Sequence, residues 1–130
     1  MEYKLKELGL RATPQRLAIL RLLEGNTAHP SAEELYNSIK PDFPSLSLTT
    51  VYNTLDSLSD AGVIQEISID SERRRFDPNP KPHNHFFCNK CRKVFDLDIY
   101  LLNFSLPQQV GDFWVEGAAV YFYGQCTDCC

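Results

Sequence analysis

The stretch that decides the fold runs from Ser47 to Phe76 and reads SLTTVYNTLDSLSDAGVIQEISIDSERRRF. Apolar residues recur in its first part at helical spacing, at Leu48, Val51, Leu55 and Leu58. Gly62 then ends the helix, and the apolar run over 63–69 with a returning strand over 73–76 predicts a β-hairpin. A helix followed by a hairpin that carries three arginines is typical of the second half of a winged-helix domain.

Two more helices are predicted on the N-terminal side of this stretch. Thr13-Pro14 combines an N-cap with a proline at the first helical position. Ser31 and Glu34 have the spacing of a capping box. Three helices followed by a hairpin is the winged-helix order, so we expect residues 1–77 to form a winged-helix DNA-binding domain.

A proline-rich segment separates this region from the rest of the chain. Residues 78–82 contain three prolines, which favour extended backbone and exclude a helix. We therefore predict a hinge at 78–82 and a second domain over 83–130. One weak helical stretch near 100–110 accompanies short apolar runs at 85–88, 93–97 and 113–123. The expected fold class is α+β, with an N-terminal winged helix and a small C-terminal α/β domain.

The composition excludes several classes of protein. With 130 residues, 43% of them hydrophobic, the chain fits one ordinary domain or two small ones and is too apolar for a disordered tail. No apolar run approaches the roughly 18–20 residues that cross a bilayer. The N-terminus lacks the apolar core of a secretory signal, so we expect a cytoplasmic protein. The net charge of -4 means that DNA binding needs locally concentrated positive charge.

Positive charge is concentrated on both sides of the predicted third helix. Residues 1–21 hold five basic and two acidic side chains, and three arginines stand at 73–75. The polar face of the helix over 48–62 carries hydroxyls and an amide, which suit phosphates and base edges. The candidate DNA contacts are Arg11, Arg16, Thr49, Thr50, Tyr52, Asn53, Arg73 and Arg74. A merely solvated polar face is the alternative, and Asp56 and Asp60 favour it.

All five cysteines lie after position 87, and four of them form two CxxC pairs. Each pair presents both thiolates to one ion, so two pairs complete a tetrahedral four-sulfur zinc site. A redox CxxC usually occurs singly, and an odd number of cysteines in a cytosolic chain argues against disulfides. The expected structural zinc ligands are Cys88, Cys91, Cys126 and Cys129. Cys130 is a spare thiol that competes with Cys129 for the fourth position.

Three histidines and two aspartates give a second candidate site, made of nitrogen and oxygen donors without sulfur. His83 and His85 form an HxH motif just before the first cysteine pair, whereas His29 belongs to the first domain. The candidate ligands are His29, Asp77, His83, His85 and Asp96. This donor set suits Fe(II), Mn(II) or Zn(II). Because the set spans both predicted domains, a metal bound by it would link them as a switch.

Several motifs, in this order, resemble those of the ferric uptake regulator (Fur) family. They are Thr13-Pro14-Gln15-Arg16, Ala28-His29-Pro30, Thr50-Val51-Tyr52-Asn53-Thr54-Leu55, Arg75-Phe76-Asp77, His83-Asn84-His85 and Cys88-x-x-Cys91. The resemblance covers essentially the whole chain. It implies a homodimeric bacterial repressor of an inverted-repeat DNA operator, with an N-terminal winged helix and a C-terminal dimerisation domain. It also implies structural zinc at the four cysteines and regulatory Fe(II) or Mn(II) at the histidines and aspartates.

Within this family the chain is most like the peroxide-sensing branch, the PerR proteins. Aspartate at both carboxylate positions of the histidine–aspartate site is similar to that branch, whereas iron-sensing members tend to carry glutamate there. The resemblance implies that peroxide acts through metal-catalysed oxidation of His29 and His83 and that DNA is then released. The alternative is an iron-sensing repressor that responds to the availability of Fe(II). Asn84, and the lack of a histidine after His85, indicate that the additional metal site of many iron sensors is absent.

Two other classes of function compete with a repressor. A metalloenzyme usually keeps three protein ligands and an open position at its metal, whereas five ligands leave little room for a substrate. The sequence also shows no Ser/His/Asp pattern and no glycine-rich phosphate loop, so we expect no enzyme. A zinc-ribbon interaction module would not need the polar helix face or the arginines. We therefore expect a metal-dependent repressor, and DNA binding with and without divalent metal separates the three classes.

Overall fold

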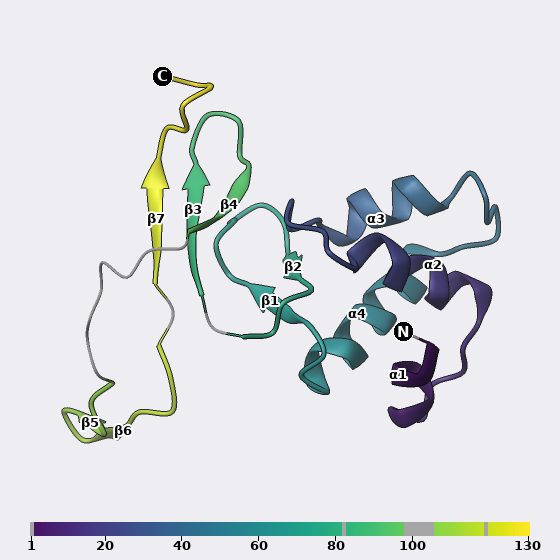
Figure 1. Ribbon diagram of the computed structural model, residues 1–130, viewed down its shortest axis with the longest axis horizontal. Helices are drawn as coiled ribbons and strands as arrows, with labels where there is room; N and C mark the ends of the chain where they lie inside the picture. Colours follow the sequence, from purple (N-terminus) through teal and green to yellow (C-terminus); the bar gives the residue numbers. More distant parts are fainter. Residues whose placement is uncertain (1, 82, 98–105, 119) are drawn as a thin grey trace. The chain divides into compact units, whose positions relative to one another are not determined.

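The computed structural model describes residues 2–81, 83–97, 106–118 and 120–130 of the chain (Figure 1). The chain divides into two compact units, Met1–Lys81 and Pro82–Cys130. Among the described residues, helices occur in the first unit and strands in both. The predicted α+β class is therefore confirmed, with a winged-helix domain followed by a smaller C-terminal domain.

The first unit begins with four helices, α1 (Glu2–Glu7), α2 (Pro14–Leu23), α3 (Ala32–Ile39) and α4 (Leu48–Asp60). Each of the last three starts after a hydroxyl side chain that accepts a hydrogen bond from the backbone N–H three residues later, at 3.1 or 3.2 Å. These N-caps are Thr13, Ser31 and Ser47. Each cap satisfies an N–H that has no partner within the helix, which is why α2, α3 and α4 begin where the sequence predicts.

Replacing Ser47 with alanine removes the cap of α4 and is expected to lower the free energy of unfolding of the first unit by about 1 kcal/mol. The substitution also removes a contact of 2.8 Å between the hydroxyls of Ser47 and Thr50. Urea unfolding followed by far-UV circular dichroism measures the loss. Ser45→Ala, at an exposed position two residues earlier, is the matched control. Equal stability of the two variants would contradict the role of the cap.

Helix α1 has no counterpart among the predicted helices. It has only six residues, and neither a capping residue nor a proline marks its start. A helix this short is not stable in isolation. Leu5 is fully buried in the core of the first unit, so tertiary packing holds α1 in its helical conformation.

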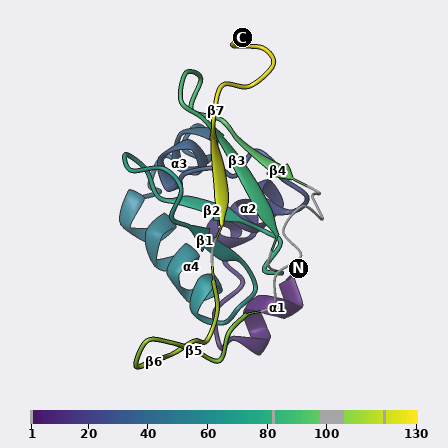
Figure 2. The ribbon, with the colours of Figure 1, turned by 90° about the vertical axis from the view of Figure 1, so that its left-hand side faces the viewer.

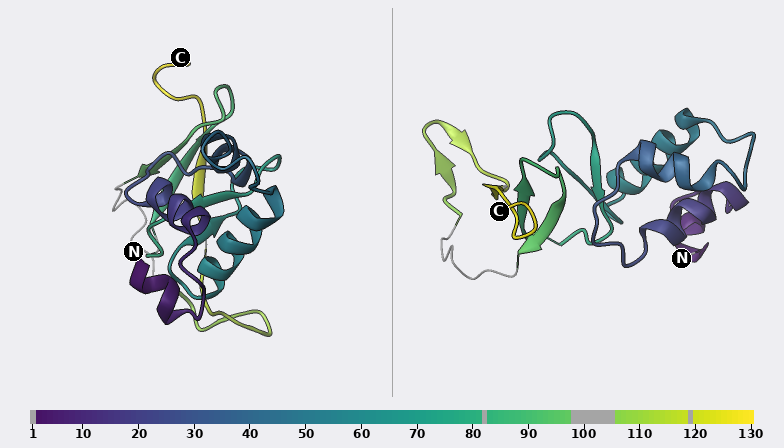
Figure 3. Two further views of the ribbon diagram at one scale, coloured as in Figure 1. Left: turned by 90° about the vertical axis from the view of Figure 1, so that its right-hand side faces the viewer. Right: turned by 90° about the horizontal axis from the view of Figure 1, so that it is seen from above.

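The core of the first unit lies where α2, α3 and α4 meet (Figure 3). Its largest contributors from these helices are Ile19, Leu20, Leu23, Leu35, Ile39, Val51, Leu55 and Leu58. Three of the four apolar residues predicted on one face of α4 are fully buried, and Leu48 is half-buried. Thr49 and Asn53 are exposed on the other side of α4. The helix therefore packs with its apolar face inward and leaves its polar face accessible.

Strands β1 (Gln65–Ile67) and β2 (Arg75–Asp77) form the antiparallel hairpin. Strand β1 is shorter than the predicted run over 63–69. Strand β2 begins two residues later than the predicted run over 73–76 and ends one residue later. Strand β2 is buried along its length, because it pairs with β1 on one edge and contacts the segment before α3 on the other. Arg75 is consequently only 6% exposed. Of the other two arginines, which are the candidate DNA contacts of this hairpin, Arg73 is exposed and Arg74 is half-buried.

The second unit is built on a three-stranded sheet (Figure 2). Its central strand is β3 (Asn84–Cys88), with β4 (Val94–Leu97) antiparallel on one side and β7 (Tyr121–Gly124) parallel on the other. The apolar runs at 85–88 and 93–97 therefore correspond to neighbouring strands. The parallel pairing of β3 with β7 brings together segments more than 30 residues apart in the chain.

A separate hairpin joins β5 (Gln109–Val110) and β6 (Phe113–Trp114). Gly111 in its two-residue turn has a φ of 59°, which glycine adopts without strain. The weak helical stretch predicted near 100–110 lies partly outside the described residues. Where it is described, at 106–110, the chain is not helical and ends in β5, because pairing with β6 overrides a weak local preference.

Candidate metal centres and DNA interface

The two CxxC pairs lie together at one end of the second unit's sheet. Strands β3 and β7 are paired with Cys88 opposite Gly124, so the turns that follow the two strands meet. The four sulfurs of Cys88, Cys91, Cys126 and Cys129 all lie within 4.8 Å of one another, and Cys91 Sγ is 3.8 Å from Cys126 Sγ. A tetrahedral ion with Zn–S bonds of about 2.3 Å places its sulfurs about 3.8 Å apart. The cluster therefore fits Zn(II).

Backbone N–H groups prepare one of these thiols for ionisation. The N–H groups of Cys91 and Cys126 lie 3.5 and 3.4 Å from Cys88 Sγ, and their hydrogen bonds lower the pKa of Cys88 to about 6. By contrast, the hydrogen bond with the Cys126 sulfur, burial and the neighbouring sulfurs raise the pKa of Cys129 to about 12. Thiols with such different pKa values become thiolates together when a metal cation displaces their protons.

Cys130 lies outside this cluster. Its residue is exposed, and its Sγ faces the carbonyl oxygen of Gln125 at 3.9 Å. The N–H groups of Cys129 and Cys130 both donate to the carbonyl oxygen of Cys126, at 3.0 and 3.1 Å, in a tight turn. Of the two thiols that compete in the sequence, this turn directs Cys129 toward the other three sulfurs.

Within the first unit, His29 lies beside Asp77. His29 Nε2 is 3.1 Å from Asp77 Oδ2, and both side chains are almost completely buried. The segment before α3 runs along β2, where the N–H of Phe76 donates to the carbonyl oxygen of Pro30 at 3.1 Å. Two donors that are 48 residues apart in the sequence therefore meet because this segment lies against the strand that ends in Asp77.

Within the second unit, two histidines share one carboxylate. Asp96 Oδ1 lies 3.0 Å from His83 Nε2 and 3.3 Å from His85 Nε2. The antiparallel register of β3 and β4 places His85 opposite Asp96. The two imidazole rings lie 4.3 Å apart, centroid to centroid. The strand pairing therefore groups three nitrogen and oxygen donors that the sequence separates.

Each unit thus carries part of the predicted five-residue ligand set, two donors in the first and three in the second. The available donors are imidazole nitrogens and carboxylate oxygens. This chemistry suits Fe(II), Mn(II) or Zn(II) and lacks the thiolates that select Cu(I). The residues present therefore fit the regulatory metal that the sequence predicts.

The candidate DNA contacts on α4 differ in their accessibility. Thr49 and Asn53 are exposed, whereas Thr50 and Tyr52 are half-buried. The hydroxyl of Tyr52 donates a hydrogen bond to the carboxylate of Glu33 on α3. This hydrogen bond raises the pKa of Tyr52 and lowers that of Glu33, so Glu33 is ionised at neutral pH and Tyr52 is not. The ring of Tyr52 is therefore held in one position.

The arginines of the hairpin are engaged by acidic side chains. Arg73 pairs with Glu34 at 3.2 Å, and Arg74 pairs with both Asp56 and Glu66 at 2.7 Å. These partners raise the pKa of Arg74 above its already high value. The guanidinium of Arg74 also lies 5.3 Å from the ring centroid of Tyr52.

At the N-terminal end of the unit, Arg11 is exposed and Arg16 is half-buried. A guanidinium N–H of Arg16 donates to the carbonyl oxygen of Arg11 at 3.0 Å. This hydrogen bond links the two predicted DNA contacts near the start of α2.

Most of the acidic partners of Tyr52, Arg73 and Arg74 could not be predicted from the sequence. Glu33 and Tyr52 are 19 residues apart, and Glu34 and Arg73 are 39 residues apart. Glu34 carries the signal of a capping box, yet its side chain pairs with arginine. Only Asp56 stands out beforehand, as an acidic residue on the polar face of the predicted helix. Contacts over such separations leave no local pattern.

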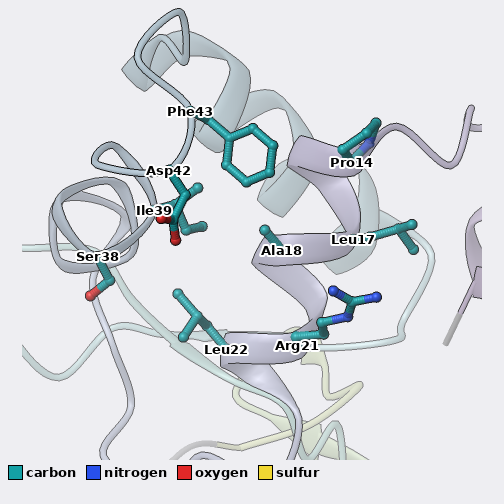
Figure 4. Close-up of a pocket in the computed structure, with 9 residues that line it drawn as sticks. All are labelled: Pro14, Leu17, Ala18, Arg21, Leu22, Ser38, Ile39, Asp42 and Phe43. Carbon is teal, nitrogen blue, oxygen red and sulfur yellow. The ribbon is translucent and has the colours of Figure 1, made fainter.

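A pocket of about 470 Å³ lies between α2 and the end of α3 (Figure 4). Its lining is mostly apolar, with Arg21 and Asp42 as its charged members. Leu22 and Ala18 of α2 face Phe43 and Ile39 across it. None of its nine lining residues is a predicted metal ligand or DNA contact.

Comparisons with known proteins point to one family. The model of the ferric uptake regulator family matches residues 7–111. The peroxide-responsive repressor PerR of Staphylococcus aureus (strain Mu50) is 39% identical over 127 residues, which are 96% of this chain and 86% of that protein. Within the described part of the chain, no helix is long and apolar enough to span a membrane.

Solved structures give the same result. The ferric uptake regulator of Vibrio cholerae superposes with a TM-score of 0.73 at 27% identity, over 96% of this chain and 98% of that one. PerR of Streptococcus pyogenes superposes with a TM-score of 0.53 at 30% identity, over 98% of this chain and 88% of that one.

Proposed function

Because the chain belongs to the ferric uptake regulator family, whose named relatives include transcriptional repressors, we propose that it is a metal-dependent repressor that senses peroxide. The observation that carries the proposal is the division of the nitrogen and oxygen donors between the two units. His29 and Asp77 meet in the first, and His83 and His85 share Asp96 in the second. Fe(II) or Mn(II) bound by all five residues would join the DNA-binding unit to the C-terminal one.

Joining the units would favour one arrangement of the protein. In a symmetric dimer, two winged helices fixed about 34 Å apart reach successive major grooves on one side of DNA. The metal shifts the equilibrium because it binds the arrangement that unites all five ligands more tightly than any open one. The operator is accordingly an inverted repeat. Residues 78–82 act as the hinge, and the protein works in the cytoplasm, where its DNA lies.

We infer the DNA contacts from exposure and charge. Thr49, Thr50, Tyr52 and Asn53 of α4 face bases and phosphates, and Arg11 and Arg16 bind phosphates beside them. Arg73 and Arg74 reach phosphates by exchanging their bonds to Glu34, Asp56 and Glu66 for bonds to DNA. Binding therefore weakens steeply with salt, as expected when phosphate contacts release counterions.

A second copy of the chain is the partner we propose for the C-terminal unit. Phe113, Trp114 and Tyr123 are 77%, 75% and 71% exposed, a large apolar area for a unit of this size. Exposed apolar patches of this kind mark protein interfaces. Zinc at Cys88, Cys91, Cys126 and Cys129 would stabilise the pairing of β3 with β7, the strand that carries Tyr123.

Peroxide sensing follows from the imidazole ligands. Fe(II), when bound, would lend one electron to start the cleavage of hydrogen peroxide and would recover it as the ring is oxidised, chemistry that Mn(II) in the same site supplies far less readily. One carbon of an imidazole ring gains one oxygen atom of the peroxide, the other oxygen leaves as water, and the ring is oxidised by two electrons. We propose His29 and His83 as the oxidised residues. Oxidation weakens the binding of the metal by these two histidines, so the metal is released and then the DNA.

Mass spectrometry of peptides after peroxide treatment tests this proposal. We expect one added oxygen on His29 and on His83 in the Fe(II) form and none in the Mn(II) form. Binding to a duplex selected from random DNA by the Mn(II)-loaded protein should fall by about tenfold or more only in the Fe(II) form. Unmodified histidines in the Fe(II) form, or DNA release that follows cysteine oxidation, would refute the mechanism.

Asp96→Glu gives a second check on the same mechanism. Because glutamate is also an oxygen donor, we expect this variant to keep metal-dependent DNA binding and to lose much of the peroxide response. Iron sensing without histidine oxidation is the alternative function, and a peroxide response that leaves both histidines unmodified would favour it. An unchanged peroxide response in Asp96→Glu would show that this carboxylate does not direct the oxidation.

A further inference from the structure

His29 has a backbone conformation that needs external support. Its φ is 55°, in the left-handed region that residues other than glycine rarely occupy, although histidine enters it more often than most. The residue is also completely buried. Such conformations persist only where the surroundings determine them, and they are common at functional sites. The groups around His29 therefore show what holds this proposed metal ligand.

The guanidinium of Arg75 contacts the backbone at this position. Its Nη1 donates a hydrogen bond of 3.3 Å to the carbonyl oxygen of His29. Ser31, two residues after His29, forms an isolated antiparallel bridge with Arg75, which aligns this segment with β2. The side chain of Arg75 is 7% exposed, so this hydrogen bond is largely shielded from water.

Arg75 is itself fixed by a buried carboxylate. Its Nε and Nη2 both lie 3.2 Å from Asp70 Oδ2, and the side chain of Asp70 is completely buried. Glu34 lies 3.5 Å from Arg75 Nη1 on another side. The planar guanidinium thus reaches a carboxylate and a carbonyl oxygen at once, which a lysine ammonium on a flexible stem does not reproduce.

Strand geometry relates Arg75 to the other ligand in this unit. Arg75 and Asp77 are two residues apart on β2, so their side chains leave the same face of the strand. Asp77 is the residue whose Oδ2 lies 3.1 Å from His29 Nε2. One face of β2 therefore supplies a proposed metal ligand and the group that holds the backbone of its partner ligand.

We propose that Arg75 is a positioning residue for the regulatory metal. Fixed by Asp70, its guanidinium holds the His29 carbonyl oxygen and thereby keeps His29 Nε2 beside Asp77, so that this part of the ligand set is formed before metal binds. The inference rests on the proposed function, because it assigns a role to Arg75 through the ligands named there. Partners that orient metal ligands in this way typically contribute about 10- to 100-fold to metal affinity.

Two variants distinguish a role of Arg75 in positioning His29 from a role in which it only neutralises the charge of Asp70. Arg75→Lys keeps a positive charge beside Asp70 but loses the fork that also reaches His29. The double variant Arg75→Met, Asp70→Asn removes both charges of the ion pair together, so no buried charge loses its counterpart. Lys40→Met is the matched control, because Lys40 Nζ donates to the carbonyl oxygen of Leu46 at 2.9 Å in the same unit but does not contact His29.

The experiment is a titration of the full-length, zinc-loaded protein with Mn(II), followed by electron paramagnetic resonance. We expect Arg75→Lys and the double variant to bind Mn(II) about 10- to 100-fold more weakly than the wild type, and Lys40→Met to match the wild type. With Co(II) as the probe, the visible absorption bands of the Arg75 variants at saturation should also change shape. Circular dichroism confirms that each variant is folded.

The outcomes distinguish this inference from the function on which it rests. Mn(II) affinity within about twofold of the wild type in Arg75→Lys and in the double variant would overturn the positioning role and leave the proposed function intact. An equal loss in Lys40→Met would also overturn it, because general destabilisation would then explain the effect. If His29→Ala binds Mn(II) as tightly as the wild type, the proposed regulatory site itself is wrong.

Discussion

Replacing Cys88 with serine is expected to release the structural zinc and to leave the protein as monomers or aggregates. Zinc binding by thiolates contributes roughly 10–16 kcal/mol at neutral pH, and in a small domain this is folding free energy. The described part of the second unit buries few large apolar side chains, chiefly Phe87 and Val94. The apolar burial seen in this described part is too small to compensate for the loss. Zinc content by elemental analysis and mass by light scattering measure the effect.

Cys130→Ser is the control for this prediction. The Cys130 thiol lies outside the four-sulfur cluster, so its replacement should keep both zinc and dimer. Cys129→Ser should behave like Cys88→Ser. Loss of zinc from Cys130→Ser together with its retention in Cys129→Ser would show that our choice of the fourth ligand is wrong.

Removal of the regulatory metal is expected to weaken operator binding by about a thousandfold, to the level of non-specific binding. Without a metal to unite His29 and Asp77 with the donors of the second unit, the two winged helices are no longer fixed at the spacing of the operator half-sites. Fluorescence anisotropy with the selected duplex, at constant salt, compares Mn(II) with a chelator that leaves zinc in place. Constant salt matters because phosphate contacts depend steeply on it.

Asp77→Ala should bind DNA as weakly with Mn(II) as the chelated wild type does. Asp42→Ala, which removes an exposed carboxylate from the same unit, is the matched control and should keep the response to Mn(II). Equal operator affinity of the wild type with Mn(II) and with chelator would refute a metal-dependent switch. That result would leave the zinc prediction unaffected, because different residues carry it.

Local patterns in the sequence determine much of this protein. Thr13, Ser31 and Ser47 mark the starts of three helices, because an N-cap acts on an N–H only three residues away. The two CxxC pairs also predict a four-sulfur cluster, because a single turn is enough for each pair to direct both thiols to one ion. The identity of the histidine and aspartate donors is likewise readable from the residue types and from the family resemblance.

Tertiary structure alone decides which of these groups meet. Helix α1 exists because Leu5 packs in the core, and β5 replaces a weak helical signal because β6 pairs with it. Burial makes Arg75 a partner of Asp70 and separates it from the two neighbouring arginines that the sequence predicts as DNA contacts. The physical reason is the range of the interactions. Caps and turns act between residues within about four positions of each other in the sequence. Burial and ion pairing depend on segments that the fold brings together, such as those of His29 and Asp77, which are 48 residues apart.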